Sequence, residues 1–79
     1  MALARILIVE DEAITALDIS RVLERLGYEV IGTADKGTKA IELTDELEPD
    51  LILMDITLKG ELDGIETSAL IQKNHNIPV

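Results

Sequence analysis

Cysteine, phenylalanine and tryptophan are absent from this 79-residue sequence, and Tyr28 is its only aromatic residue. The lack of cysteine excludes disulfide bonds, thiolate metal sites and a cysteine nucleophile, and the core must be aliphatic. The longest apolar run has four residues, whereas a membrane-spanning helix needs about 20. No secretory signal opens the sequence. We therefore expect a cytoplasmic protein with no membrane segment.

Basic residues are few: 7 Lys and Arg stand against 16 Asp and Glu, which gives a formal net charge of −9. Proteins that bind nucleic acid gain much of their affinity from Lys and Arg beside phosphates, so we expect no direct nucleic-acid binding. Cations or basic partners fit this charge better. The hydrophobic content of 47% excludes disorder, and the length predicts a single domain over residues 1–79 with a thin core.

Three short apolar runs divide the sequence at regular intervals and predict strands over residues 6–9, 28–31 and 51–54. The first and third runs are continuously apolar and partly β-branched, which is typical of parallel strands covered on both faces. Residues 77–79 have the character of the first residues of a fourth strand, where a proline is tolerated.

Segments with helical spacing separate these runs. Gly27 stands where the first helix is expected to end, Pro49 stops the second, and a third is expected from Ile65 to about Lys73. The apolar stripes consist of Ala16, Ile19, Leu23 and Leu26 in the first segment and Ala40, Ile41, Thr44 and Leu47 in the second. Alternating strands and helices predict an α/β fold with a parallel sheet and right-handed crossovers.

Acidic residues follow directly on two of the expected strands: residues 10–12 (Glu-Asp-Glu) on the first and Asp55 on the third. Ligands of open α/β sheets bind beyond the carboxyl ends of the strands, so Asp11 and Asp55 meet there if these strands are neighbours. Crowded carboxylates repel one another unless a cation compensates, and a few oxygen ligands suit Mg²⁺. The alternative is that residues 10–12 only cap the following helix and that Asp55 only begins a loop.

Residues 6–12 (Ile-Leu-Ile-Val-Glu-Asp-Glu) and 51–56 (Leu-Ile-Leu-Met-Asp-Ile) closely resemble the receiver domain of two-component response regulators. Residues 27–30, 48–51 and 63–66 match the same family in the same order. The resemblance implies a flavodoxin-like, doubly wound parallel sheet with strand order 2-1-3-4-5. This chain would hold three strand–helix units and the start of a fourth strand.

The resemblance also implies a function, that of a signalling phosphoprotein in a phosphorelay rather than an enzyme. Asp55 would accept a phosphoryl group from a sensor histidine kinase or a phosphotransfer protein. Mg²⁺ would be the cofactor. Its ligands would be Asp11 directly, Glu10 through water, Asp55, and the backbone carbonyl of Thr57.

Three departures from the family's pattern bear on that implication. The acidic pair is Glu10-Asp11 rather than the commoner Asp-Asp, and the loop after Asp55 lacks the usual proline, with Gly64 one residue late. The chain also stops at Val79. We therefore expect a C-terminally incomplete receiver, without the hydroxyl residue and the lysine that end the family's fourth and fifth strands.

Other functions stay open beside the phospho-acceptor. If the missing hydroxyl residue and lysine of the fourth and fifth strands are indispensable for phosphorylation, the chain is a phosphorylation-incompetent interaction module. A Mg²⁺-dependent phosphohydrolase with an Asp nucleophile is disfavoured, because the first strand is not followed by Asp-x-Asp. An unpaired apolar edge on the third strand is a template for association, so we expect a homodimer, strand exchange with a second copy, or partial unfolding.

Overall fold

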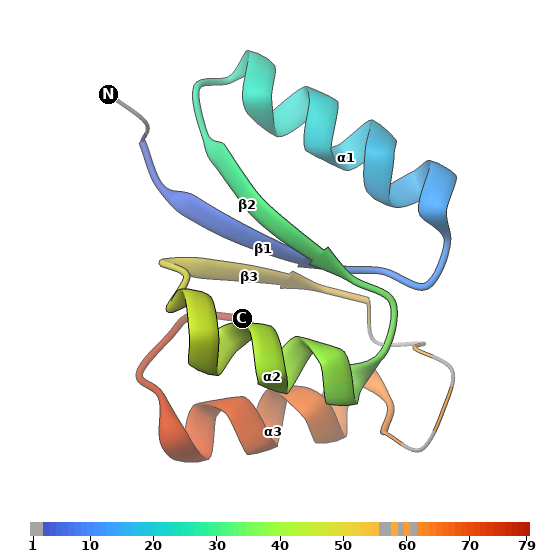
Figure 1. The fold of residues 1–79 in the computed structure, drawn as a ribbon, viewed down its shortest axis with the longest axis vertical. Coiled ribbons are helices and arrows are strands. Elements are labelled where there is room, and N and C mark those ends of the chain that lie inside the picture. The colour runs from blue at the N-terminus through green and yellow to red at the C-terminus, as the bar shows by residue number, and fades with distance from the viewer. Residues whose placement is uncertain (1–2, 56–57, 59, 61) are drawn as a thin grey trace.

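The fold was obtained as a computed structural model that describes residues 3–55, 58, 60 and 62–79. Its elements are β1 (Arg5–Val9), α1 (Ala13–Arg25), β2 (Glu29–Ala34), α2 (Gly37–Leu47), β3 (Leu51–Met54) and α3 (Gly64–Asn74). The strands form a parallel sheet in the order β2-β1-β3, with α1 on one face and α2 and α3 on the other (Figure 1). The predicted α/β fold is confirmed, and so is the expectation that the first and third strands are neighbours.

β1 lies at the centre of the core because helices cover both of its faces. Each of residues 6–9 is at most 1% exposed, and their side chains alternate between the two faces. One cluster fills the side of α2 and α3, and the other fills the side of α1. The first cluster contains Leu7, Val9, Ala34, Ala40, Ile52, Leu58 and Ile71, and the second contains Ile6, Ile8 and Ala16.

α3 begins with a capping box, in which two residues satisfy each other's backbone donors. The Asp63 carboxylate accepts a hydrogen bond from the Glu66 N–H at 2.8 Å, and the Glu66 carboxylate accepts one from the Asp63 N–H at 3.4 Å. The helix therefore begins at Gly64, within one residue of the predicted start. None of the helices in the described part of the chain is long and apolar enough to span a bilayer.

The apolar stripe of α1 is shorter than the sequence predicts. Ala16 is buried and Ile19 and Leu23 pack against the second cluster, but Leu26 is 60% exposed. The helix ends at Arg25 and the chain turns at Gly27, whose φ is 98°. Because Leu26 lies between these points, it is left at the end of the helix, and its prediction as a core residue is wrong.

Residues 77–79 lie beside the outer edge of β3 without forming a regular strand. The Ile52 N–H donates to the Pro78 carbonyl at 3.0 Å, so the segment has the place expected of a fourth strand. Pro78 has no N–H to return a hydrogen bond. Among the described residues, the expected strand start is therefore present as this backbone contact rather than as a ladder.

Candidate functional site

The acidic residues that follow β1 and β3 lie side by side because these strands are parallel neighbours. Val9 of β1 is paired with Met54 of β3, so Glu10 and Asp55 leave the sheet at the same level. The Asp55 N–H donates to the Val9 carbonyl at 2.9 Å, and the Glu10 N–H donates to the Ala34 carbonyl of β2 at 2.9 Å. Backbone hydrogen bonds thus hold both residues at the carboxyl edge of the sheet.

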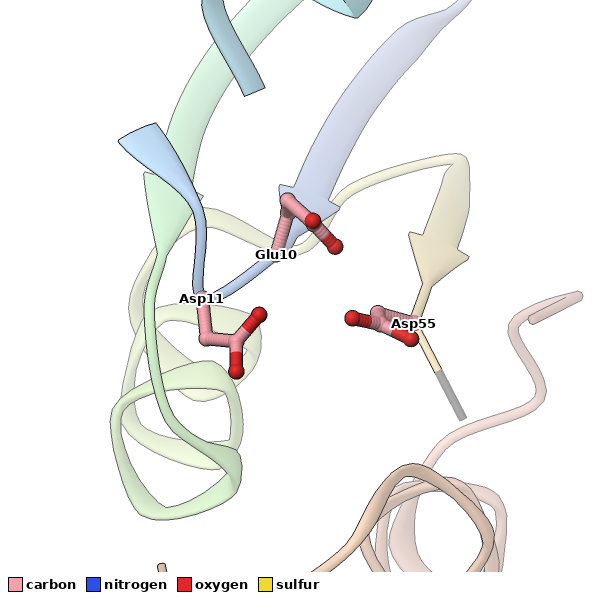
Figure 2. A group of neighbouring side chains, drawn as sticks. All are labelled: Glu10, Asp11 and Asp55. Atoms are coloured by element: carbon pink, nitrogen blue, oxygen red, sulfur yellow. The ribbon is translucent and has the colours of Figure 1, made fainter. Parts of the chain in front are cut away.

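Three carboxyl groups converge at this edge. Glu10, Asp11 and Asp55 each offer an oxygen atom, and these atoms lie within 4.8 Å of one another. The three side chains point toward a common space, Glu10 and Asp11 from the end of β1 and Asp55 from the end of β3 (Figure 2). All three residues are half-buried. Asp11 and Asp55 therefore meet as expected from the order of the strands, although they are far apart in the sequence.

The Glu10 carboxyl holds its proton more tightly than an ordinary glutamate does. Desolvation raises the pKa of Glu10, and a hydrogen bond to the Asp55 side chain raises it further, as do the negative charges of Asp55, Asp11 and Glu12. The site is therefore crowded with negative charge, and a bound cation would relieve this repulsion.

The donor set fits a small, hard cation. Its side-chain donors are carboxylate oxygens, which Mg²⁺ prefers, together with several water molecules. One hollow of about 300 Å³ adjoins Glu10 and Asp55, and another of about 450 Å³ adjoins Glu10, Asp11 and Asp35. These hollows leave room for water and for a phosphoryl group beside the carboxylates.

The side chains of residues 10–12 do not serve as a helix cap. Glu12 is the N-cap residue of α1, but its side chain makes no capping hydrogen bond. The carboxyl groups of Glu10 and Asp11 instead face Asp55 (Figure 2). No side-chain hydrogen bond of Glu12 supports the helix-capping alternative, and the arrangement of Glu10 and Asp11 fits a site shared with Asp55.

Asp35 is an acidic residue of this edge that the sequence pattern does not predict. It follows β2 and lines the hollow beside Glu10 and Asp11, outside the group of three. The apolar run over residues 28–31 ends before the strand does, so Asp35 is not marked as a strand-end residue. The expected fourth ligand, the backbone carbonyl of Thr57, lies outside the described residues.

Sequence comparison relates the chain to a signalling family. The response regulator receiver domain family matches residues 6–79. The transcriptional regulatory protein PdtaR of Mycobacterium tuberculosis is 37% identical over 75 residues, which cover 95% of this chain and 36% of PdtaR. The chemotaxis protein CheY of Thermotoga maritima is 41% identical over 69 residues, which cover 87% of this chain and 57% of CheY. The chain thus spans well under two thirds of the length of either relative.

Solved structures agree with this relationship. The signal receiver domain of a modulated diguanylate cyclase from Desulfovibrio desulfuricans G20 has a TM-score of 0.90 and 41% identity, over 98% of this chain and 62% of that one. The response regulator PhyR from Brucella abortus has a TM-score of 0.91 and 37% identity, over 100% of this chain and 32% of that one. Sequence and fold agree over nearly the whole length, and the chain therefore belongs to the receiver-domain family of two-component response regulators.

Proposed function

We propose that the chain acts as a phospho-acceptor in a two-component phosphorelay and that Asp55 receives the phosphoryl group. In this proposal Asp11 would hold Mg²⁺ directly and Glu10 would hold it through water, and Asp55 and the backbone carbonyl of Thr57 would be further ligands. The observation that carries the proposal is the convergence of three carboxyl groups within 4.8 Å at the edge of a receiver-family sheet.

In this proposal the Asp55 carboxylate is the nucleophile. One of its oxygens attacks the phosphorus of a phosphohistidine, the P–N bond breaks as the P–O bond forms, and the nitrogen leaves with the bonding electron pair. The product is an acyl phosphate on Asp55. Mg²⁺, when held by these residues, would supply charge compensation for the phosphoryl oxygens. The hydrogen bond from the Asp55 N–H to the Val9 carbonyl holds the backbone of the nucleophile during the attack.

Asp55 must be ionised to attack phosphorus. Its neighbour Glu10 has a raised pKa, which is caused first by desolvation and then by interaction with the Asp55 side chain. Positive charge at the site favours the ionised form of both carboxyl groups, because metal ligands bind in their deprotonated state. A cation at the site would therefore favour the carboxylate form that attacks phosphorus.

The proposed phosphoryl donor is a sensor histidine kinase or a phosphotransfer protein of the cytoplasm. The net charge of −9 suits a partner with a basic docking surface and does not suit nucleic acid. A structural relative with a TM-score of 0.89, PhyR from Bartonella quintana, has been crystallised with the anti-sigma factor NepR. That example supports a protein as the partner of this chain.

Incubation with acetyl phosphate and Mg²⁺, followed by intact-mass measurement, tests the acceptor directly. The 79-residue chain should gain the mass of one phosphoryl group, and a chelator should prevent the gain. Asp55→Asn should abolish it. The matched control Asp18→Asn changes an exposed carboxylate of α1 and should still gain the mass of one phosphoryl group.

The outcomes separate the competing functions. A phosphoryl gain that persists in Asp55→Asn would show that another residue is the acceptor. No gain in the unchanged chain would favour the phosphorylation-incompetent interaction module instead.

A further inference from the structure

Leu58 is buried although it belongs to no strand or helix. It lies in the connection between β3 and α3, three residues after Asp55, and is only 6% exposed. Its side chain is part of the core cluster on the side of α2 and α3. The chain that leaves Asp55 is therefore attached to the core almost at once.

The same cluster lies directly beneath the acidic site. Val9, one of its members, precedes Glu10, and its carbonyl accepts the Asp55 N–H at 2.9 Å. Ala34, another member, accepts the Glu10 N–H at 2.9 Å. Packing in this cluster is thus coupled to the backbone of Glu10 and Asp55, two of the three residues whose carboxyl groups form the site.

We propose that Leu58 is a positioning residue for the site, and that its burial holds the Asp55 carboxylate within reach of Glu10 and Asp11. The inference rests on the proposed function, because it assigns a role in Mg²⁺ and phosphoryl chemistry at that site. The three residues from Asp55 to Leu58 can span at most about 10 Å. Burial of Leu58 therefore limits how far Asp55 can lie from the core cluster.

The site needs such an anchor because of the coordination geometry of the proposed cation. Mg²⁺ demands near-ideal octahedral coordination, and a displacement of about 1 Å in a reacting group can slow a reaction about 100-fold. Asp55 has a backbone hydrogen bond to β1 on its N-terminal side. In this proposal Leu58 supplies the attachment on the C-terminal side, and the two attachments together restrain the position of Asp55.

The test compares two substitutions that each remove one methylene from the same cluster. Leu58→Val changes the anchor beside Asp55, whereas the matched control Ile71→Val changes α3, whose Ile71 is 1% exposed. The first readout is the ¹³C shift of the Glu10 and Asp55 carboxyl carbons in the metal-free protein. The second is the Mg²⁺ affinity from the same spectra. Leu58→Met, which restores the volume, serves as the rescue variant.

Leu58→Val should shift the signals of both carboxyl carbons and weaken Mg²⁺ binding about tenfold. Ile71→Val should give carboxyl shifts and an Mg²⁺ affinity close to those of the unchanged chain. Leu58→Met should restore both values. The positioning role would be overturned if Leu58→Val and Ile71→Val changed the carboxyl shifts and the Mg²⁺ affinity equally. It would also be overturned if Leu58→Val left the carboxyl shifts unchanged. If the unchanged chain binds no Mg²⁺, the proposed function fails, while the carboxyl shifts still decide the role of Leu58. Should Leu58→Val not fold, the volume-conserving pair Leu58→Ile and Ile71→Leu is compared in the same way.

Discussion

The Glu10 carboxyl makes the stability of the metal-free protein dependent on pH. Folding raises the pKa of Glu10 above its ordinary value of 4.5, by desolvation first and then by the hydrogen bond to Asp55 and nearby negative charge. Between the ordinary and the raised pKa, the folded protein binds more protons than the unfolded chain. The free energy of unfolding contributed by this group therefore falls as the pH rises through that window.

We predict that Glu10→Gln abolishes this decrease in the free energy of unfolding with rising pH. Without Mg²⁺, the variant should gain stability relative to the unchanged chain as the pH is raised from 4.5, because no negative charge develops at position 10. Thermal unfolding at several pH values, in the presence of a chelator, measures the effect. Parallel pH profiles for the two proteins would contradict the assigned environment of Glu10.

α2 and α3 meet at a point that has no room for a side chain. A Cβ atom on Gly37, the first residue of α2, would collide with Thr67 Oγ1 and lie 3.0 Å from the Leu62 Cβ. Thr67 is fully buried, and its hydroxyl donates to the Asp63 carbonyl at 2.7 Å. Since the hydroxyl cannot move away without losing this bond, Gly37→Ala should lower the free energy of unfolding by about 1–3 kcal/mol.

Urea unfolding of Gly37→Ala beside Gly32→Ala checks this close approach of the two helices. A Cβ on Gly32 would meet its nearest neighbour, Leu47 Cδ1, at 3.4 Å, which is close to an ordinary contact. Gly32→Ala should therefore be clearly less destabilising. Similar losses at both positions would show that the junction of α2 and α3 has more freedom than the distances indicate.

A second link joins the far ends of the same two helices. His75 Nε2 lies 2.7 Å from Asp45 Oδ1, and the two side chains are 22% and 62% exposed. The sequence pattern favours a solvated histidine, because His75 stands between two asparagines. Because the pair is partly exposed, a double-mutant cycle of His75→Ala and Asp45→Ala should give a coupling of about 0.5 kcal/mol. A coupling indistinguishable from zero would show that the contact contributes nothing to the packing of α2 and α3.

The sequence predicts the elements better than the contacts between them. The continuous apolar runs at residues 6–9 and 51–54 predict central strands, and the acids that follow them predict Asp11 beside Asp55. The raised pKa of Glu10 beside Asp55 could not be predicted, nor could the exclusion of a side chain at Gly37. Both depend on distances between segments that are remote in the sequence, which periodicity and strand ends do not encode.

The whole molecule leaves much aliphatic surface in contact with water. α1 packs against β1 and β2, so that Leu51 and Leu53 of β3 remain only half-buried on that face of the sheet. Large apolar side chains are also exposed on the helices, among them Ile14 at 77% and Ile65 at 67%. Such surface favours association, and a small domain has little stability in reserve.

We therefore predict that the 79-residue chain either self-associates or is partly unfolded in dilute solution. Light scattering after size exclusion, with amide exchange on the same sample, distinguishes these states. Association should increase with concentration and should protect the amides of residues 51–54. A compact monomer at every concentration, with strong protection across β3, would show that the exposed apolar surface is tolerated.

A magnesium titration followed by ¹⁵N NMR tests the central claim, that Glu10, Asp11 and Asp55 form one cation site. Mg²⁺ should shift the amide signals of residues 10–12 and 55, and Asp11→Asn should weaken binding at least about tenfold. The exposed Asp18→Asn should leave the affinity unchanged. If no Mg²⁺-dependent shift appears at residues 10–12 and 55, or if Asp11→Asn binds as well as the unchanged chain, the assignment of the site is wrong.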